Sequence, residues 1–455
     1  MDDNALRQLI ECLPAGVVVT DPDTMEKYRF DRSQDAATGT PALVVRAEDA
    51  GQVQAAVRWA AAHRVPVVPR GAGSGLSGGS SAVDGGMVLS LERMRAVEID
   101  TDCQVAVVEP GAFNAEVKEA AAAHGLWYPP DPSSYEFCSI GGNIATNAGG
   151  LCCVKYGVTT DYVLGLDVVL ADGSLVTLGG KRIKDVAGLP LIKLFVGSEG
   201  TLGVVTRAIL RLVPEQAPRS TMVATFPTVD AAARAVVAVR RTMRPSMLEL
   251  MDRASINAVE DYRPRGLDRS AGALLVAQSD APGTARSEEV ELMRVACVEA
   301  GAPEVFVTDD ADEGEMFVEA RRIAIPAIEA QGALMLEDVG APVPLLPDLL
   351  AAIGEVAAAY DVRIPVIAHA GDGNTHPIVV FEAGDAESEK RALAAFREVM
   401  QRAIDLGGTI TGEHGVGRTK KELLPTQLGP EVMALSQRIK DALDPDGILN
   451  PGAVL

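Results

Sequence analysis

Three of the five histidines lie within about the last ninety residues, inside two short motifs that also contain glycine and acidic residues. In "HAGDGNTHP", His369 and His376 flank a Gly-rich turn between two apolar stretches, which predicts a hairpin that brings the two imidazoles together. The second motif, "TGEHGVGR", adds Glu413 and His414. Two imidazoles and a carboxylate suit a divalent metal with open positions for a substrate. Packed or solvated histidines are the alternative, and the motifs by themselves leave both interpretations open.

Glycine-rich runs are the second candidate for chemistry, and there are three of them, Gly71–Gly79, Ser139–Gly150 and Gly197–Gly203. The first contains G-x-G-x-x-G after an apolar strand, but the residues that follow, "SSAVDGGMVLSLER", predict another strand where a Rossmann loop requires a helix. The Lys-Ser/Thr pair of a P-loop is also absent. Successive backbone N–H groups in such loops can cradle a pyrophosphate without a helix. One run would be an ordinary surface loop, whereas three predict a long ligand such as a dinucleotide.

The elements that must position these residues fall into two different patterns. Before Pro214, short strands such as "PALVVRA" and "VPVVPR" alternate with amphipathic helices, residues 129–150 read as one long loop, and Asp172-Gly173 marks a hairpin turn. After Pro214, strands alternate with Ala-rich helices, which predicts a separate α+β domain. We therefore predict four segments: an N-terminal helix and entry at 1–35, a cofactor-binding domain at 36–214, a substrate domain at 215–405, and a C-terminal segment at 406–455 that completes the site.

Composition narrows the functional classes. A chain of 455 residues predicts two or three domains, and a net charge of −22 without a basic run argues against nucleic acid as a partner. Charged residues interrupt every long apolar run, so no integral membrane segment is expected, and the acidic N-terminus is unlike a signal peptide. The six cysteines form no C-x-x-C pair or iron–sulfur pattern, and all six are expected to be small buried apolar residues. These features predict a cytoplasmic protein, with a peripheral location at the inner face of the membrane as the alternative.

The three runs also carry a family resemblance. In order, "VPVVPRGAGSGLSGG", "YPPDPSSYEFCSIGGNIATNAGGLCCVKYG" and "LFVGSEGTLGVVT" resemble the PCMH-type FAD domain of the vanillyl-alcohol-oxidase superfamily. The similarity extends from about Pro41 to the C-terminus and is greatest to glycolate oxidase flavin subunits and FAD-linked D-lactate dehydrogenases. It implies an α+β fold: a PCMH-type domain of two α/β subdomains, then a cap domain with an antiparallel sheet, and a C-terminal helical segment that returns to the flavin.

The same resemblance implies the residues that contact FAD. Relatives that bind the flavin covalently carry a His where this chain has Ser74, so non-covalent FAD is expected. The matched positions are Pro69, Arg70, Gly71, Ala72, Gly73, Ser74, Gly75, Pro132, Ser133, Ser139, Gly141, Gly142, Asn143, Thr146, Gly149, Gly150, Gly157, Glu199, Gly200, Gly203, Val204 and Asn450.

"HAGDGN-x-HP" and "GEHG-x-G" match the metal-dependent D-2-hydroxy-acid dehydrogenases of this superfamily. The match implies a divalent metal, zinc first with manganese or iron as alternatives, bound by His369, His376 and Glu413. It also implies three catalytic residues: the base His414, the substrate-carboxylate residue Arg321 in "EARRIAIPA", and the orienting residue Asn374. The expected reaction is oxidation of a small D-2-hydroxy acid, of the D-lactate or glycolate type, to the 2-oxo acid with hydride transfer to flavin N5.

Departures from the family pattern bear on the substrate. Relatives that act on D-2-hydroxyglutarate carry polar residues where this chain has Ile325 and Leu336, which favours a small or apolar substrate side chain. Pro190 replaces an Asp that many relatives have, so that loop is expected to differ.

Several interpretations stay open. The alternatives are a D-2-hydroxyglutarate dehydrogenase, a flavin subunit of a glycolate oxidase complex, and a non-redox or reductase flavoenzyme resembling the enolpyruvyl reductase of cell-wall synthesis. The electron acceptor could be a quinone, a cytochrome, an iron–sulfur subunit, an electron-transfer flavoprotein or oxygen. A homodimer is one expected assembly.

Overall fold

The protein is described by a computed structural model that covers residues 3–33 and 37–455. Residues 1–2 and 34–36 lie outside the described chain, and the predicted limit between residues 35 and 36 falls on them. The chain forms two compact units. Unit 1 comprises Met1–Gly149, Val158–Glu215 and Glu413–Leu455, and unit 2 comprises Gly150–Gly157 and Gln216–Gly412.

Unit 1 begins with a four-stranded sheet of order β1-β2-β4-β3. Its strands are β1 (Val18–Val19), β2 (Leu43–Arg46), β3 (Val67–Arg70) and β4 (Met87–Ser90), of which β2, β4 and β3 are parallel. Helix α3 (Ala50–His63) connects β2 to β3; the Asp49 side chain caps its N-terminus and Arg64 ends it in the left-handed conformation. Trp59 of α3 and Leu9 of α1 (Asp3–Cys12) are buried in the core of this sheet. The first glycine run therefore begins where β3 ends, and β4, not a helix, is the next element.

A second sheet of unit 1 has five antiparallel strands in the order β5-β6-β10-β8-β9. The strands are β5 (Val97–Asp100), β6 (Val105–Val108), β8 (Val163–Val169), β9 (Leu175–Gly179) and β10 (Val204–Arg211). The predicted β8–β9 hairpin is confirmed, with Gly173 at φ +76° in its turn. The other elements of unit 1 are α2 (Pro22–Glu26), α4 (Asn114–Ala122), β7 (Leu126–Trp127), α5 (Ile140–Thr146), η1 (Thr159–Asp161), α7 (Ile192–Phe195), β11 (Val213–Pro214), η3 (Lys421–Leu423) and α15 (Leu424–Leu443).

Helix α5 corrects the expectation of one loop over residues 129–150. The Ser139 side chain accepts a hydrogen bond from the Gly142 N–H at its N-terminus, and Asn147 ends the helix at φ +55°. Two glycines in seven residues lower the intrinsic helix propensity of this segment, and for that reason the sequence pattern did not predict a helix. The Ser and Asn caps were the available signals.

Unit 2 is built on an eight-stranded antiparallel sheet. Its order is β15-β12-β14-β13-β18-β19-β16, and β17 also pairs with β19. The bounds are β12 (Ser220–Phe226), β13 (Met247–Asp252), β14 (Ala273–Ser279), β15 (Glu304–Thr308), β16 (Ala333–Leu336), β17 (Val339–Gly340), β18 (Val366–His369) and β19 (Asn374–Phe381).

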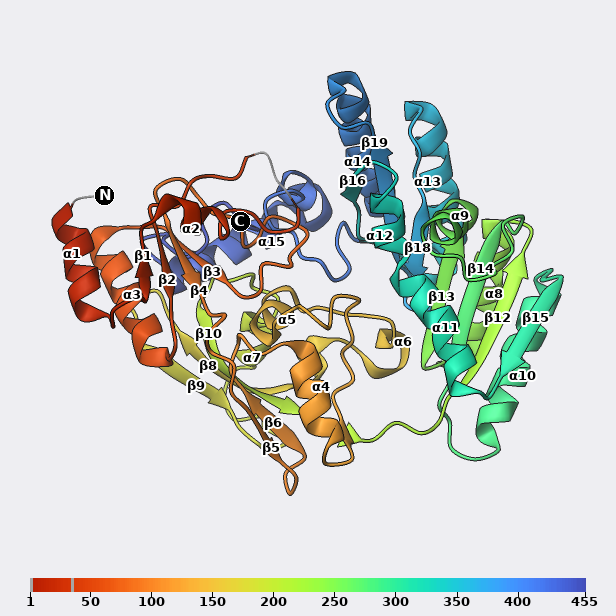
Figure 1. The fold of residues 1–455 in the computed structure, drawn as a ribbon, viewed down its shortest axis with the longest axis horizontal. Coiled ribbons are helices and arrows are strands. Elements are labelled where there is room, and N and C mark those ends of the chain that lie inside the picture. The colour runs from red at the N-terminus through yellow and green to blue at the C-terminus, as the bar shows by residue number, and fades with distance from the viewer. Residues whose placement is uncertain (1–2, 34–36) are drawn as a thin grey trace. The chain divides into compact units, whose positions relative to one another are not determined.

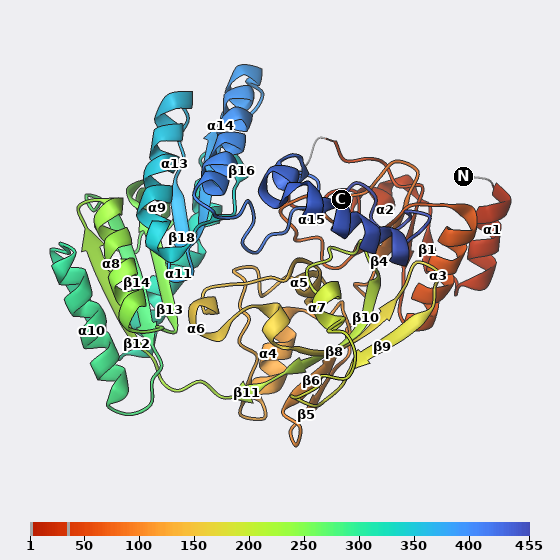
Figure 2. The same ribbon diagram turned by 180° about the vertical axis from the view of Figure 1, so that it is seen from behind.

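Helices cover both faces of this sheet. Those nearer the viewer in Figure 1 are α9 (Arg253–Tyr262), α11 (Ala311–Arg322) and α12 (Ala324–Glu329). Those nearer the viewer in Figure 2 are α8 (Val229–Thr242), α10 (Ala285–Glu299) and α13 (Leu346–Tyr360), with α14 (Ala386–Asp405) packed on α13. The short α6 (Cys153–Tyr156) and η2 (Val343–Leu345) complete unit 2. The two units, each built of helices and largely antiparallel sheets, confirm the predicted α+β class.

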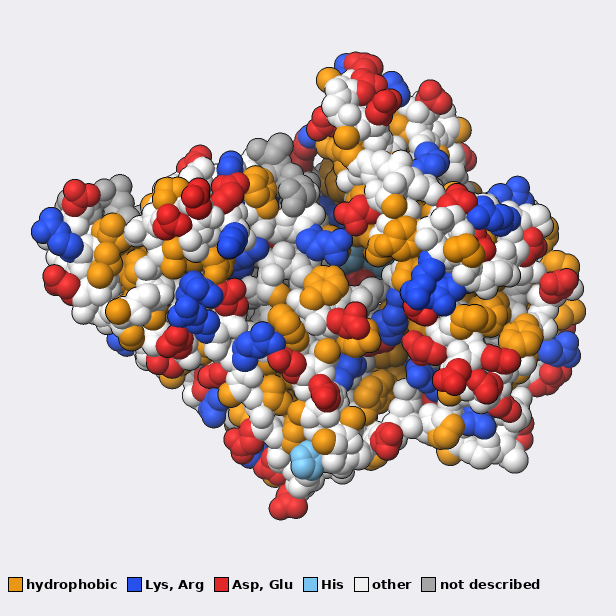
Figure 3. Space-filling view, viewed as in Figure 1, with side chains coloured by type: hydrophobic (Ala, Val, Ile, Leu, Met, Phe, Trp, Pro, Cys, Tyr) orange, Lys and Arg blue, Asp and Glu red, His pale blue; other side chains and the backbone are white. Residues whose placement is uncertain are grey.

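One segment, Val343–Tyr360, has the length and mean hydropathy (1.4) to cross a membrane, a test that core helices also pass. It consists of η2 and α13, and α13 packs against α14 and α8. Its buried side chains recur at helical spacing along one face: Leu346, Leu349, Leu350, Ile353 and Val356. That spacing is typical of a helix lying on a globular core. On the face shown in Figure 3, acidic and basic side chains are interspersed.

The expectation that all six cysteines are buried is wrong for two of them. Cys12, the last residue of α1, and Cys103, in the turn between β5 and β6, are exposed, and Cys153 is half-buried. A helix end and a hairpin turn lie at the surface, whereas Cys138, Cys152 and Cys297 are buried as expected.

Candidate active site

The first two glycine runs meet in unit 1. The Ser139 hydroxyl oxygen accepts hydrogen bonds from the backbone N–H groups of Ala72 (3.1 Å) and Gly142 (3.3 Å). A Cβ on Gly71 would lie 2.1 Å from that same oxygen, so any larger residue there would displace the Ser139 hydroxyl and its two hydrogen bonds. Gly71, Gly73 and Ala72 retain partial or full exposure, which leaves bare backbone open to a ligand.

The buried Arg70 side chain stabilises the conformation of the first glycine run. Arg70 is 7% exposed, and its guanidinium donates hydrogen bonds to the carbonyl oxygens of Phe30 (2.8 Å) and Ser80 (3.1 Å). A Cβ on Gly73, which has φ +71°, would lie 2.1 Å from Arg70 Nη2. Arg70 precedes the loop and Ser80 follows it, so the hydrogen bond between them connects the two ends of the loop. The guanidinium also packs against the backbone of Gly73.

Asn450, near the C-terminus, connects the first glycine run to Glu199 of the third. The Asn450 amide donates to the carbonyl oxygens of Gly79 (2.7 Å) and Glu199 (2.7 Å). The buried Glu199 carboxylate accepts from the N–H groups of Val416 (2.7 Å) and Gly417 (2.8 Å). All three runs therefore converge with the segment that follows "GEHG".

The three converging glycine runs could together bind FAD. Half-exposed, glycine-rich loops offer backbone N–H groups suited to a pyrophosphate, and the residues present fit that group. The predicted FAD residues lie in these runs and beside them, in unit 1, except for Gly150 and Gly157, which delimit the segment that clusters with unit 2.

Replacing Gly71 with Val should weaken FAD binding. A side chain there must displace Ser139, and overpacking of about 1–3 kcal/mol corresponds to roughly 5- to 150-fold in affinity. FAD titration of the deflavinated protein measures this loss. Gly354→Ala in α13 is the control, since nothing lies within 4 Å of its Cβ position. Unchanged affinity in Gly71→Val would contradict this placement of the cofactor.

Glu199 predicts a pH dependence of stability. Burial, opposed by the hydrogen bonds from Val416 and Gly417, raises its pKa from 4.5 to about 7. The folded protein therefore holds this proton more tightly than the unfolded chain does. Its stabilising contribution is complete below the unfolded pKa and is lost as the pH rises through about 7, by up to about 1.4 kcal/mol per pH unit.

We expect Glu199→Gln to remove this dependence. The melting temperature of the variant, relative to the parent, should rise between about pH 5 and pH 8. The exposed Glu98→Gln is the control. A difference that stays constant across this range would show that Glu199 is ionised throughout.

In unit 2, the predicted hairpin is confirmed. β18 and β19 pair antiparallel, with His369 opposite Asn374 and Ile367 opposite His376. Because side chains alternate along a strand, His369 and Ile367 share a face, and His376 is on it too. The two buried rings have centroids 5.0 Å apart at 88°.

A carboxylate also reaches these imidazoles. Glu413 and His414 directly follow Gly412, whose N–H donates to Asp338 Oδ2 (2.9 Å). One potential ligand atom from each of His369, His376 and Glu413 lies within 4.8 Å of the others. Two imidazoles and one carboxylate fit a zinc-type ion with an open position. The predicted ligands are thus brought together.

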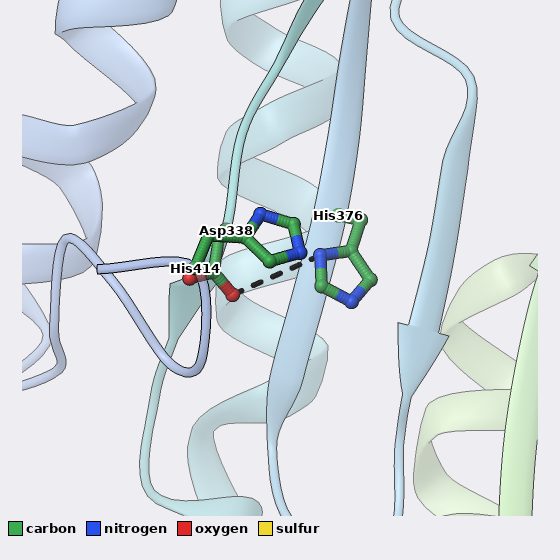
Figure 4. Close-up of side chains that lie close together, drawn as sticks. All are labelled: Asp338, His376 and His414. Atoms are coloured by element: carbon green, nitrogen blue, oxygen red, sulfur yellow. Dashed lines mark ion pairs between the residues drawn. The ribbon is translucent and has the colours of Figure 1, made fainter. Parts of the chain in front are cut away.

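A second overlapping group contains Asp338, His376 and His414, shown in Figure 4. The dashed line there joins Asp338 Oδ1 to His376 Nδ1, 3.8 Å apart. Asp338 is fully buried between β16 and β17, and its other oxygen accepts from Thr411 Oγ1 (2.7 Å). Sequence reasoning missed Asp338, although an acidic pair after an apolar strand, "LMLED", was a signal.

The remaining predicted catalytic residues also lie in unit 2. Arg321, at the end of α11, is 2% exposed, and its Nη2 lies 2.9 Å from Glu249 Oε2 in β13. Asn374 is the first residue of β19. A Cβ on Gly412 would lie 2.5 Å from Asn374 Cγ, so the absence of a side chain at Gly412 allows its backbone to pack against the Asn374 amide. Glu249 was missed by sequence reasoning.

Comparison with known proteins identifies the family. Residues 215–454 match the family described as "FAD linked oxidases, C-terminal domain", and residues 41–179 match "FAD binding domain". The chain belongs to the FAD linked oxidases. This FAD-linked oxidase is therefore an oxidoreductase that binds FAD.

Curated relatives are similar over nearly their whole length. This FAD-linked oxidase is 41% identical to the glycolate oxidase subunit GlcD of Bacillus subtilis, covering 93% of this chain and 91% of the relative. It is 36% identical to the subunit of that name from Escherichia coli (99% and 90%). It is 35% identical to a D-lactate dehydrogenase of Archaeoglobus fulgidus (94% and 96%).

Solved structures share the fold at low identity. A 4-ethylphenol oxidase from Gulosibacter chungangensis gives a TM-score of 0.82 at 20% identity, covering 99% of this chain and 96% of that one. A p-cresol methylhydroxylase gives 0.84 at 17%, with the same coverage.

Proposed function

We propose that this FAD-linked oxidase oxidises a small D-2-hydroxy acid, of the D-lactate or glycolate type, to the 2-oxo acid with help from a divalent metal. The observation that carries the proposal is the cluster of His369, His376 and Glu413, with His414 next in the chain. The names of the relatives, glycolate oxidase subunit and D-lactate dehydrogenase, support the substrate class. The ligand set favours zinc, with manganese or iron as alternatives.

Each residue of the site has a task that its chemistry allows. When bound, the metal would lower the pKa of the substrate hydroxyl, and FAD would accept the hydride from the adjacent carbon. The neutral imidazole of His414 takes the hydroxyl proton near neutral pH. The Arg321 guanidinium balances the substrate carboxylate, and Asn374 orients the substrate. The substrate thus loses one proton and one hydride.

The substrate side chain is proposed to be small or apolar. Leu336 is buried and Ile325 is half-buried. Both are apolar at positions where the family resemblance implies polar residues in enzymes that act on D-2-hydroxyglutarate. A distal carboxylate would lack these partners and would lose affinity. D-2-hydroxyglutarate is accordingly the less favoured substrate.

The test is anaerobic reduction of the flavin by a panel of substrates. D-lactate and glycolate should bleach the visible flavin band rapidly, whereas L-lactate and D-2-hydroxyglutarate should bleach it slowly. Fastest bleaching by D-2-hydroxyglutarate would overturn the substrate assignment. A yellow protein that no 2-hydroxy acid bleaches would overturn the function.

A flavin subunit of a larger complex is the second candidate, because relatives from Bacillus subtilis and Escherichia coli are named as glycolate oxidase subunits. We further propose non-covalent FAD, a cytoplasmic location and a separate electron acceptor. Turnover of the purified chain with an artificial acceptor distinguishes a self-sufficient enzyme from one that requires partner subunits.

A further inference from the structure

We infer that Glu249 is a positioning residue whose single carboxylate orients the metal ligand His369 and also holds Arg321 in place. The inference rests on the proposed metal site and goes beyond it, because Glu249 lies outside every motif that defined the site. It comes from a neighbouring strand, β13, about 120 residues earlier in the chain.

The sheet register places Glu249 beside the histidines. Leu250 of β13 pairs with Ala368 of β18, and Met251 pairs with Ile367. In an antiparallel pair the next opposed positions are Glu249 and His369. His376 lies on the same face of the following strand, as shown above. Glu249, His369 and His376 thus lie on one face of the sheet, on the neighbouring strands β13, β18 and β19.

The contact to His369 sets its tautomer. His369 Nδ1 lies 2.8 Å from Glu249 Oε1 and 3.0 Å from Oε2, and both side chains are at most 5% exposed. An ionised carboxylate only accepts hydrogen bonds, so Nδ1 carries the hydrogen. Nε2 then presents its lone pair to the metal, and the ring is held in orientation.

The same carboxylate also holds Arg321. Glu249 and Arg321 form an ion pair at 2.9 Å, with side-chain exposures of 1% and 2%. A buried carboxylate requires a positive partner, and the permanently charged guanidinium supplies it. One residue accordingly links the metal ligand to the residue proposed for the substrate carboxylate.

The first test measures zinc affinity by competition with a chromophoric chelator. Glu249→Leu removes both interactions and should weaken zinc binding about 10- to 100-fold. Glu249→Gln keeps an oxygen that can accept from Nδ1–H, so its affinity should lie between those of Glu249→Leu and the parent. Glu260→Gln is the matched control, because Glu260 is a buried carboxylate of the same unit that accepts hydrogen bonds from the N–H groups of Arg265 and Leu267.

A double variant separates positioning from stability. Glu249→Leu alone leaves Arg321 buried without this partner and should lower the melting temperature. Glu249→Leu/Arg321→Met replaces the buried pair with apolar groups and should restore much of the melting temperature, but not the zinc affinity. Recovery of zinc affinity together with stability would overturn the positioning role.

The second test needs no metal. With ¹⁵N-labelled histidine, long-range ¹H–¹⁵N spectra of the metal-free protein should show His369 protonated at Nδ1, with the signal assigned through His369→Gln. Protonation at Nε2 would overturn the inference. If the parent and Glu249→Leu bind zinc equally tightly, the positioning role of Glu249 is overturned and the proposed function stays intact. A parent with no zinc affinity would overturn the metal-assisted function itself, whichever tautomer is found.

Discussion

Replacing His414 with Gln is expected to slow flavin reduction about 10²- to 10⁴-fold, because the substrate hydroxyl then has no positioned base. The defect should fall mainly on the rate of reduction and only weakly on the substrate concentration required. FAD content should stay unchanged, since the three glycine runs and Asn450 hold the FAD loops. Anaerobic rapid-mixing measurements of the flavin band give the rate.

The metal content of this variant decides between the two ligand groups. If His369, His376 and Glu413 are the ligands, His414→Gln retains its zinc. If Asp338, His376 and His414 are the ligands, the variant loses zinc and His414 cannot be the base. His124→Gln, at an exposed position of the same unit, is the control for the substitution itself.

Replacing His376 with Gln should abolish metal binding, because His376 belongs to both possible ligand groups. Loss of a Lewis acid worth several kcal/mol corresponds to a rate loss on the order of 10³-fold. Metal analysis and the same anaerobic rates measure both effects. The visible flavin spectrum should persist, since the proposed FAD loops lie in unit 1. A metal-free His376→Gln protein that reduces its flavin at the parent rate would show that the histidine cluster is structural.

Local patterns predicted much of the fold and of the candidate site. The "HAGDGNTHP" hairpin is confirmed because a Gly-rich turn between two apolar strands leaves few other conformations. Rejection of a Rossmann loop is also confirmed, because β4 follows the first glycine run. Helix α5 was missed because its glycines concealed a segment that Ser139 and Asn147 cap. The predicted limits of the four segments stay predictions.

The missed residues depend on pairing between distant strands. Glu249 lies next to His369 only because β13 and β18 are neighbours in the sheet, and no local pattern specifies that neighbour. The one available signal was a charge within the apolar strand "MLELMD", since a buried carboxylate needs a partner. Asp338 likewise lies close to His376 and Gly412 only in the folded protein, because both are distant from it in the sequence.

The most direct test of the account compares flavin reduction in zinc-loaded, zinc-free and zinc-restored protein under anaerobic conditions, with the best substrate of the panel. We predict rapid bleaching of the flavin band with zinc, a loss on the order of 10³-fold after chelation, and full recovery on zinc addition. FAD content must be equal in all three samples. Equal rates with and without metal would contradict the account, because the histidine cluster would then take no part in the oxidation.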